Sequence, residues 1–138
     1  MEAISIVAGR FLLGLYFLVP GIRKFTESDK LVAYMQSHDI AFAPQLLGFA
    51  GVVSIIGGIF LMTGRHIKIV SYGFVVYVLL VNFMLHDFWT MSADLLAHVL
   101  QNFVKNLAVV AGLLVLAGYA PLRRPLLNSW WQSDKSVR

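Results

Sequence analysis

The chain has 138 residues, of which 59% are hydrophobic and only 13% are charged, whereas soluble domains carry about a quarter charged residues. A soluble domain this short leaves too much of its surface in water to hide so many apolar side chains, so the composition predicts a membrane protein. The formal net charge of +4 is spread along the chain, which argues against nucleic-acid binding, and the sequence has no cysteine for disulfides or thiolate metal sites.

Four continuous apolar runs predict four transmembrane α-helices. They cover about 4–22, 45–63, 67–85 and 103–120, and each can cross a hydrocarbon core of roughly 30 Å at about 1.5 Å per residue. A barrel strand would alternate apolar and polar residues instead. We therefore expect an all-α membrane protein with a single four-helix domain over residues 1–138.

Pro20 lies near the end of the first run, where it is expected to kink or end the helix and lead into the first long loop. This run lacks the basic n-region and the small-residue cleavage site of a secretory signal. We expect it to be retained as the first span.

The distribution of Lys and Arg predicts that both termini are cytoplasmic. One side of the membrane would carry Arg10, Arg65, Lys68 and the basic tail 121–138, and the other side carries cations that acidic residues offset. Trp130 and Trp131 in this tail are typical of an interfacial anchor, with a partner-docking peptide as the alternative.

Small residues at spacings of four indicate where the helices approach one another, because lipid-embedded helices associate through close backbone packing. The second span has Ala50, Ser54 and Gly58, and the fourth has Ala108 and Gly112. A compact bundle is the simplest expectation.

Arg10 lies about two turns inside the first span, where a charge that faces lipid is costly. It either extends toward the headgroups or makes a structural hydrogen bond to a residue such as Ser54. The functional alternative is a fixed cation that orients an anionic or quinone-like ligand.

On the predicted outer side, polar residues of several helices fall at one level, and His86 beside Asp87 is the pair best suited to move a proton near neutral pH. These residues either line one pocket or cap helix ends and meet interfacial water. The ligand-binding candidates, with Arg10 included, are Arg10, Lys24, Asn82, His86, Asp87, Lys105 and Asn106.

A metal site is a weak alternative. Asp94 and His98 are four residues apart and, with His38 and Asp39, supply ligand types that bind metals. They match no known ligand spacing, so we expect no metal site and no intrinsic cofactor.

Several motifs resemble the DoxX family of small four-helix inner-membrane proteins. The residues that carry the resemblance are Gly9-Arg10, Leu12-Leu13-Gly14-Leu15, Phe17, Gly21 and Lys24 in the first span, Gly57 to Gly64 in the second, His86-Asp87-Phe88-Trp89 after the third, and Phe103 to Ala108 with Gly112-Leu113-Leu114 in the fourth. Many members have a glutamate where this chain has Ser54, so a counter-ion for Arg10 at that position is missing.

The resemblance implies a multi-pass protein of the bacterial cytoplasmic membrane, in contact with lipid and often accessory to a membrane or redox protein partner. Some relatives are subunits of thiosulfate:quinone oxidoreductase. We expect a quinone-associated accessory subunit that is not catalytic alone and that binds a quinone. The alternative is a non-enzymatic scaffold or a small-solute transport module, for which a homo-oligomer would be needed to form a wide path.

Overall fold

The computed structural model describes residues 2–85 and 93–121. Within them the chain forms α-helices and no strands, in the order α1 (Glu2–Thr26), α2 (Ser28–Gln36), α3 (Ala43–Thr63), α4 (Ile67–Leu85) and α5 (Ala93–Tyr119). All but the short α2 are long and apolar enough to cross a membrane. The predicted all-α fold with four spans is confirmed, and the predicted tail 121–138 lies, after Pro121, outside the described residues.

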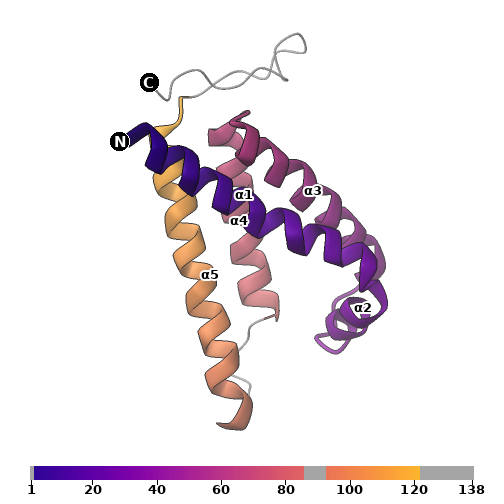
Figure 1. Ribbon diagram of the computed structural model, residues 1–138. Coiled ribbons are helices and arrows are strands. Elements are labelled where there is room, and N and C mark those ends of the chain that lie inside the picture. The colour runs from indigo at the N-terminus through magenta and orange to yellow at the C-terminus, as the bar shows by residue number, and fades with distance from the viewer. Residues whose placement is uncertain (1, 86–92, 122–138) are drawn as a thin grey trace.

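The four spans pack as two pairs, α1 with α3 and α4 with α5. The pairs meet at the end of the molecule that holds the start of α1, the α3–α4 loop and the end of α5, which we call the terminal face (Figure 1). From there they diverge toward the opposite end, the α2 face. The two helix pairs therefore lie close together at one end of the molecule and further apart at the other.

Close backbone contact holds α1 against α3. A Cβ atom on Gly14 would lie 2.6 Å from the Gly58 carbonyl oxygen, and one on Gly58 would lie 2.7 Å from the Gly14 carbonyl oxygen. Further along, Gly21 lies against the buried Ser54. The predicted small-residue face of this span is thus confirmed for Ser54 and Gly58, and it packs against α1.

The small residues of α5 behave differently. Ala108 is exposed, and a Cβ on Gly112 would meet only Leu13, at 3.9 Å, among its described neighbours. The spacing of Ala108 and Gly112 therefore makes no close helix contact within the described chain.

The core lies near the terminal face, where the two pairs meet. Phe17 of α1 stacks on Phe74 of α4 with ring centroids 3.7 Å apart, and Gly57 of α3 leaves room for the Phe74 ring. Leu61 and Leu113 are fully buried in the same cluster. Aromatic packing here joins α1, α3 and α4.

The helices extend further than hydropathy predicts, except α4, which has the predicted bounds. Helix α1 continues through Pro20 to Thr26, and α5 begins at Ala93 instead of near residue 103. Residues 93–102 include polar side chains that lower hydropathy, but backbone hydrogen bonding continues in a helix whether lipid or water surrounds it. Hydropathy detects the lipid-exposed stretch and not the whole helix.

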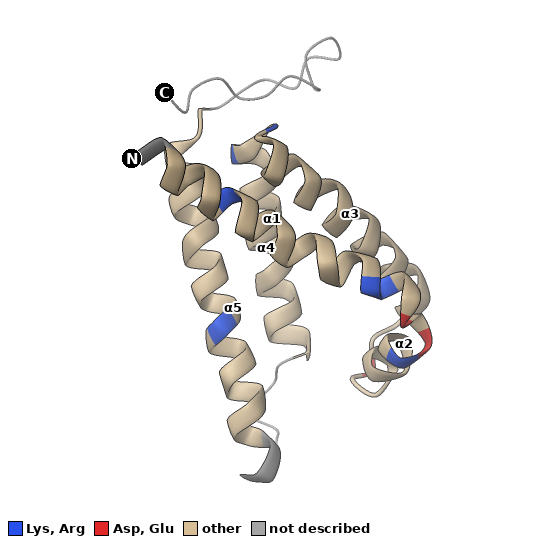
Figure 2. Ribbon diagram, viewed as in Figure 1, with Lys and Arg blue, Asp and Glu red and all other residues tan. Residues whose placement is uncertain are grey.

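Most charged residues lie toward the two faces of the molecule. Figure 2 shows Lys and Arg near both faces, acidic residues at α2, and a basic position midway along α5, where Lys105 lies. Between them most exposed side chains on the spans are apolar, such as Leu12, Val76 and Val115. Lipid is the solvent that such surfaces require.

Candidate functional site

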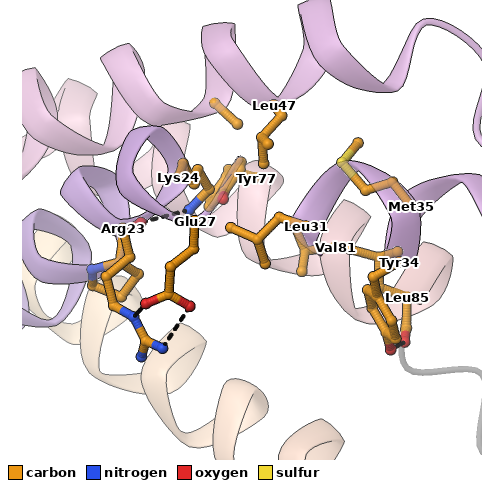
Figure 3. A pocket seen from close by; sticks show the side chains of 12 residues that line it. Arg23, Lys24, Glu27, Leu31, Tyr34, Met35, Leu47, Tyr77, Val81 and Leu85 are labelled. Atoms are coloured by element: carbon orange, nitrogen blue, oxygen red, sulfur yellow. Dashed lines mark hydrogen bonds and ion pairs between the residues drawn. The ribbon is translucent and has the colours of Figure 1, made fainter. Parts of the chain in front are cut away.

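A cavity of about 340 Å³ lies at the α2 face, between α1, α3 and α4, and α2 covers it (Figure 3). Leu31, Tyr34 and Met35 of α2 line it on one side. The Tyr34 hydroxyl donates a hydrogen bond of 2.9 Å to the carbonyl oxygen of Leu85, the last residue of α4. This bond ties α2 to α4 across the opening between the helix pairs.

An ion pair forms one edge of the cavity. Arg23 Nε donates to Glu27 Oε1 at 2.9 Å and Arg23 Nη2 donates to Glu27 Oε2 at 3.1 Å, the two-point geometry that favours arginine–carboxylate pairs. These hydrogen bonds lower the pKa of the Glu27 carboxyl. Glu27 therefore stays ionised at neutral pH, and the pair places no net charge at this edge.

Lys24 supplies the unneutralised positive charge of the cavity lining. Its ammonium lies 5.9 Å from the centroid of the Tyr77 ring, within the range of a cation–π contact. It also donates a long hydrogen bond of 3.5 Å to the Pro20 carbonyl oxygen. An ammonium has three N–H donors, so Lys24 can also donate to an acceptor on a ligand in the cavity.

Asn82 and Asn106, two of the ligand-binding candidates, meet in a buried hydrogen-bond chain. Asn106 Nδ2 donates to Asn82 Oδ1 at 3.0 Å, and Asn82 Nδ2 donates to the Phe103 carbonyl oxygen at 3.1 Å. The Tyr16 hydroxyl donates to Asn106 Oδ1 at 3.0 Å. The chain joins α1, α4 and α5, and sequence reasoning missed Tyr16 because it looks like an ordinary apolar-face residue of a span.

Lys105 is exposed on α5 and donates a 3.0 Å hydrogen bond to Asn102 Oδ1. Since Asn106 pairs with Asn82, one turn before α4 ends, this part of α5 lies close to the α2 face. Lys105 thus lies near the predicted membrane boundary, where a lysine can reach water.

The structure does not gather the described ligand-binding candidates at the cavity. Lys24 lines the cavity, whereas Arg10, Asn82, Lys105 and Asn106 do not. His86 and Asp87 lie outside the described residues, so their suggested part in moving a proton stays a prediction.

Arg10 lies near the terminal face, at the far end of the α1–α3 pair from the cavity. A Cβ on Gly64, the residue after α3, would lie 2.8 Å from Arg10 Cζ. Ser54 lies instead beside Gly21, and the ten residues from Ser54 to Gly64 span about 15 Å of helix. Of the alternatives for Arg10, a hydrogen bond to Ser54 itself is therefore wrong, because the antiparallel pairing of α1 and α3 places the two side chains at different levels.

No group of three His, Asp or Glu side chains near enough to hold a metal ion occurs in the described part of the chain. His38 Nδ1 lies 2.9 Å from the Tyr34 carbonyl oxygen and His98 Nε2 lies 3.3 Å from Asn102 Nδ2. The Asp94 side chain lies outside the described region.

Sequence reasoning also missed α2 and its cavity-lining side chains. Tyr34 and Met35 follow Leu31 by three and four residues, a spacing that places all of them on one helical face. Asp29 in the first turn suits the positive end of the helix dipole. The spacing of these apolar residues is visible in the sequence, but it was missed because the segment is short and has a low mean hydropathy.

Comparison with known proteins identifies a family. A model of the DoxX family matches residues 5–87, which cover most of α1 and all of α2, α3 and α4. The resemblance of residues 103–114 lies outside this match and stays a prediction. No curated protein and no solved structure matches the chain.

Proposed function

Because the chain belongs to the DoxX family, we propose that it is an accessory subunit of a membrane redox complex and holds a quinone in the cavity beneath α2. The observation that carries the proposal is the cavity itself, in which a cation and an aromatic ring, Lys24 and Tyr77, line an otherwise largely apolar space. A quinone is a flat apolar ring with carbonyl acceptors, so it can donate no hydrogen bonds and needs a donor from the protein. Lys24 is that donor.

The proposal assigns electron transfer to a partner protein. A cysteine-free sequence cannot supply the thiolates that usually hold iron–sulfur clusters. The subunit's own contribution is to bind the ring, orient its carbonyl toward Lys24 and exclude water. His86 and Asp87 follow Leu85 in the sequence and stay predicted participants, as do Asn82, Lys105 and Asn106.

Placement in the bacterial cytoplasmic membrane with cytoplasmic termini is part of the same proposal. The α3–α4 loop at the terminal face carries Arg65 and is followed by Lys68, and such cations favour the cytoplasmic side. The cavity then opens near the outer leaflet.

The test is mild solubilisation followed by mass spectrometry of the co-purified small molecules and proteins. We compare the wild type with Lys24→Ala and with Lys30→Ala, a matched control that removes an exposed lysine of α2 outside the cavity lining. Losing a hydrogen bond from a charged group costs roughly 1.5–3 kcal/mol, or about tenfold or more in affinity.

Quinone retained by the wild type and Lys30→Ala, but reduced in Lys24→Ala, supports the site. Equal retention by all three proteins would overturn it. A stable protein partner without any quinone would favour the scaffold alternative.

A further inference from the structure

A second hollow of about 360 Å³ lies between α3 and α4. Its walls are apolar side chains such as Phe49 and Val53 on α3 and Val76 and Leu80 on α4. It shares Met35, Ala50, Tyr77, Val81 and Leu85 with the cavity beneath α2. The two spaces therefore adjoin one another along these five residues, and we call the second one the lateral groove.

The lateral groove opens to the lipid side of the molecule. Phe49, Val76 and Leu80, on its walls, are 70%, 58% and 56% exposed. Gly73 keeps part of the α4 wall free of side chain, and a Cβ at this position would meet nothing within 4 Å. In a bilayer this opening faces acyl chains instead of water.

Polarity changes from one space to the other. The cavity has Lys24 and the Arg23–Glu27 pair at its edge, whereas Tyr77, which lines both spaces, is the polar residue of the groove. A ligand with a polar ring and a long apolar tail matches this order, with the ring beside Lys24 and the tail between α3 and α4.

We infer that the site takes long-tailed, lipid-soluble quinones, which enter from the bilayer between α3 and α4 and leave their tail in the lateral groove. This inference rests on the proposed quinone site and adds the tail-binding path. Because the tail moves from one apolar solvent to another, the groove adds little hydrophobic free energy. The contribution of the groove is steric: it provides space for the tail while the ring is bound.

The experiment places a side chain in the groove with Gly73→Phe. The control is Gly118→Phe on α5, another exposed glycine at which a Cβ would meet nothing within 4 Å and which lines none of the cavities described above. The probes are the ubiquinone ring without a tail and the same ring carrying a decyl chain. Binding to purified protein is measured by calorimetry, corrected for partitioning of each probe into detergent.

We expect Gly73→Phe to weaken binding of the decyl probe about tenfold, which is about 1.4 kcal/mol, and to leave the tailless ring unchanged. Gly118→Phe should change neither affinity. Equal weakening of both probes by Gly73→Phe, or equal effects of the two variants, would overturn the tail path while leaving the ring site intact.

If neither probe binds the wild type, the proposed quinone site itself fails and the tail path fails with it. Should Gly73→Phe not fold, Val76→Trp fills the same groove from an exposed position and carries the same comparison.

Discussion

Arg10 is positioned by the end of a neighbouring helix. Gly64 follows α3 with a φ of 73°. Its N–H donates to the Leu61 carbonyl oxygen, and the Arg65 N–H donates to the Phe60 carbonyl oxygen. These two hydrogen bonds form a Schellman motif, which ends the helix. The Arg10 guanidinium lies against this turn. A cation at a helix C-terminus is stabilising by about 0.3–1 kcal/mol at exposed sites and by more where water is scarce.

We predict that Gly64→Ala destabilises the protein for two separable reasons. The backbone part is the cost of a left-handed conformation for an L-residue, about 1–2 kcal/mol, and the second part is the overlap of the new Cβ with the Arg10 side chain. In an Arg10→Ala background only the backbone part should remain. Thermal unfolding of both single variants and the double variant measures this, and strictly additive losses would show that Arg10 does not contact Gly64.

At the scale of the elements, glycine decides how closely α1 and α3 approach. At Gly14 and Gly58 each backbone occupies the space that a Cβ on the other helix would need. Helix α2 is a different kind of element, because none of its residues is buried and the Tyr34–Leu85 bond holds it to α4. The spans depend on backbone proximity, and α2 depends on surface contacts over the cavity.

We expect Gly58→Ala to lower the unfolding temperature. The overlap with the Gly14 carbonyl oxygen, typical of overpacking, costs about 1–3 kcal/mol, which exceeds the roughly 0.5–1 kcal/mol that alanine gains over glycine in a helix. Gly9→Ala is the matched control, since a Cβ there meets nothing within 4 Å, and it should be neutral or slightly stabilising. Equal effects of the two changes would contradict the close approach.

For the whole molecule, the two faces can be distinguished chemically because the sequence has no cysteine. Ser37→Cys places a single thiol just after α2, at an exposed position, and Lys68→Cys places one in the first turn of α4 at the terminal face. In intact spheroplasts, an impermeant maleimide should label the first variant and reach the second only after permeabilisation. The reverse pattern would place both termini outside.

Apolar run length determined the four spans, because a lipid environment requires long helices whose backbone groups are bonded within the segment. The observed bounds of α4 agree with those predicted from its apolar run. The family was also assigned from local information, namely sequence motifs in α1 and α3. Small-residue spacing also predicted the packing face of Ser54 and Gly58, since close approach depends on side-chain size.

The tertiary structure alone decided which polar residues meet. Antiparallel pairing of α1 with α3 brings Arg10 to Gly64 and keeps it from Ser54, and the pairing of Asn82 with Asn106 places both in a buried hydrogen-bond chain away from Lys24. The spacing of residues along a helix fixes the face on which a side chain lies. The partner of that side chain depends on the level and tilt of the neighbouring helix. The cavity beneath α2 has the same origin, because it exists only where the two helix pairs diverge.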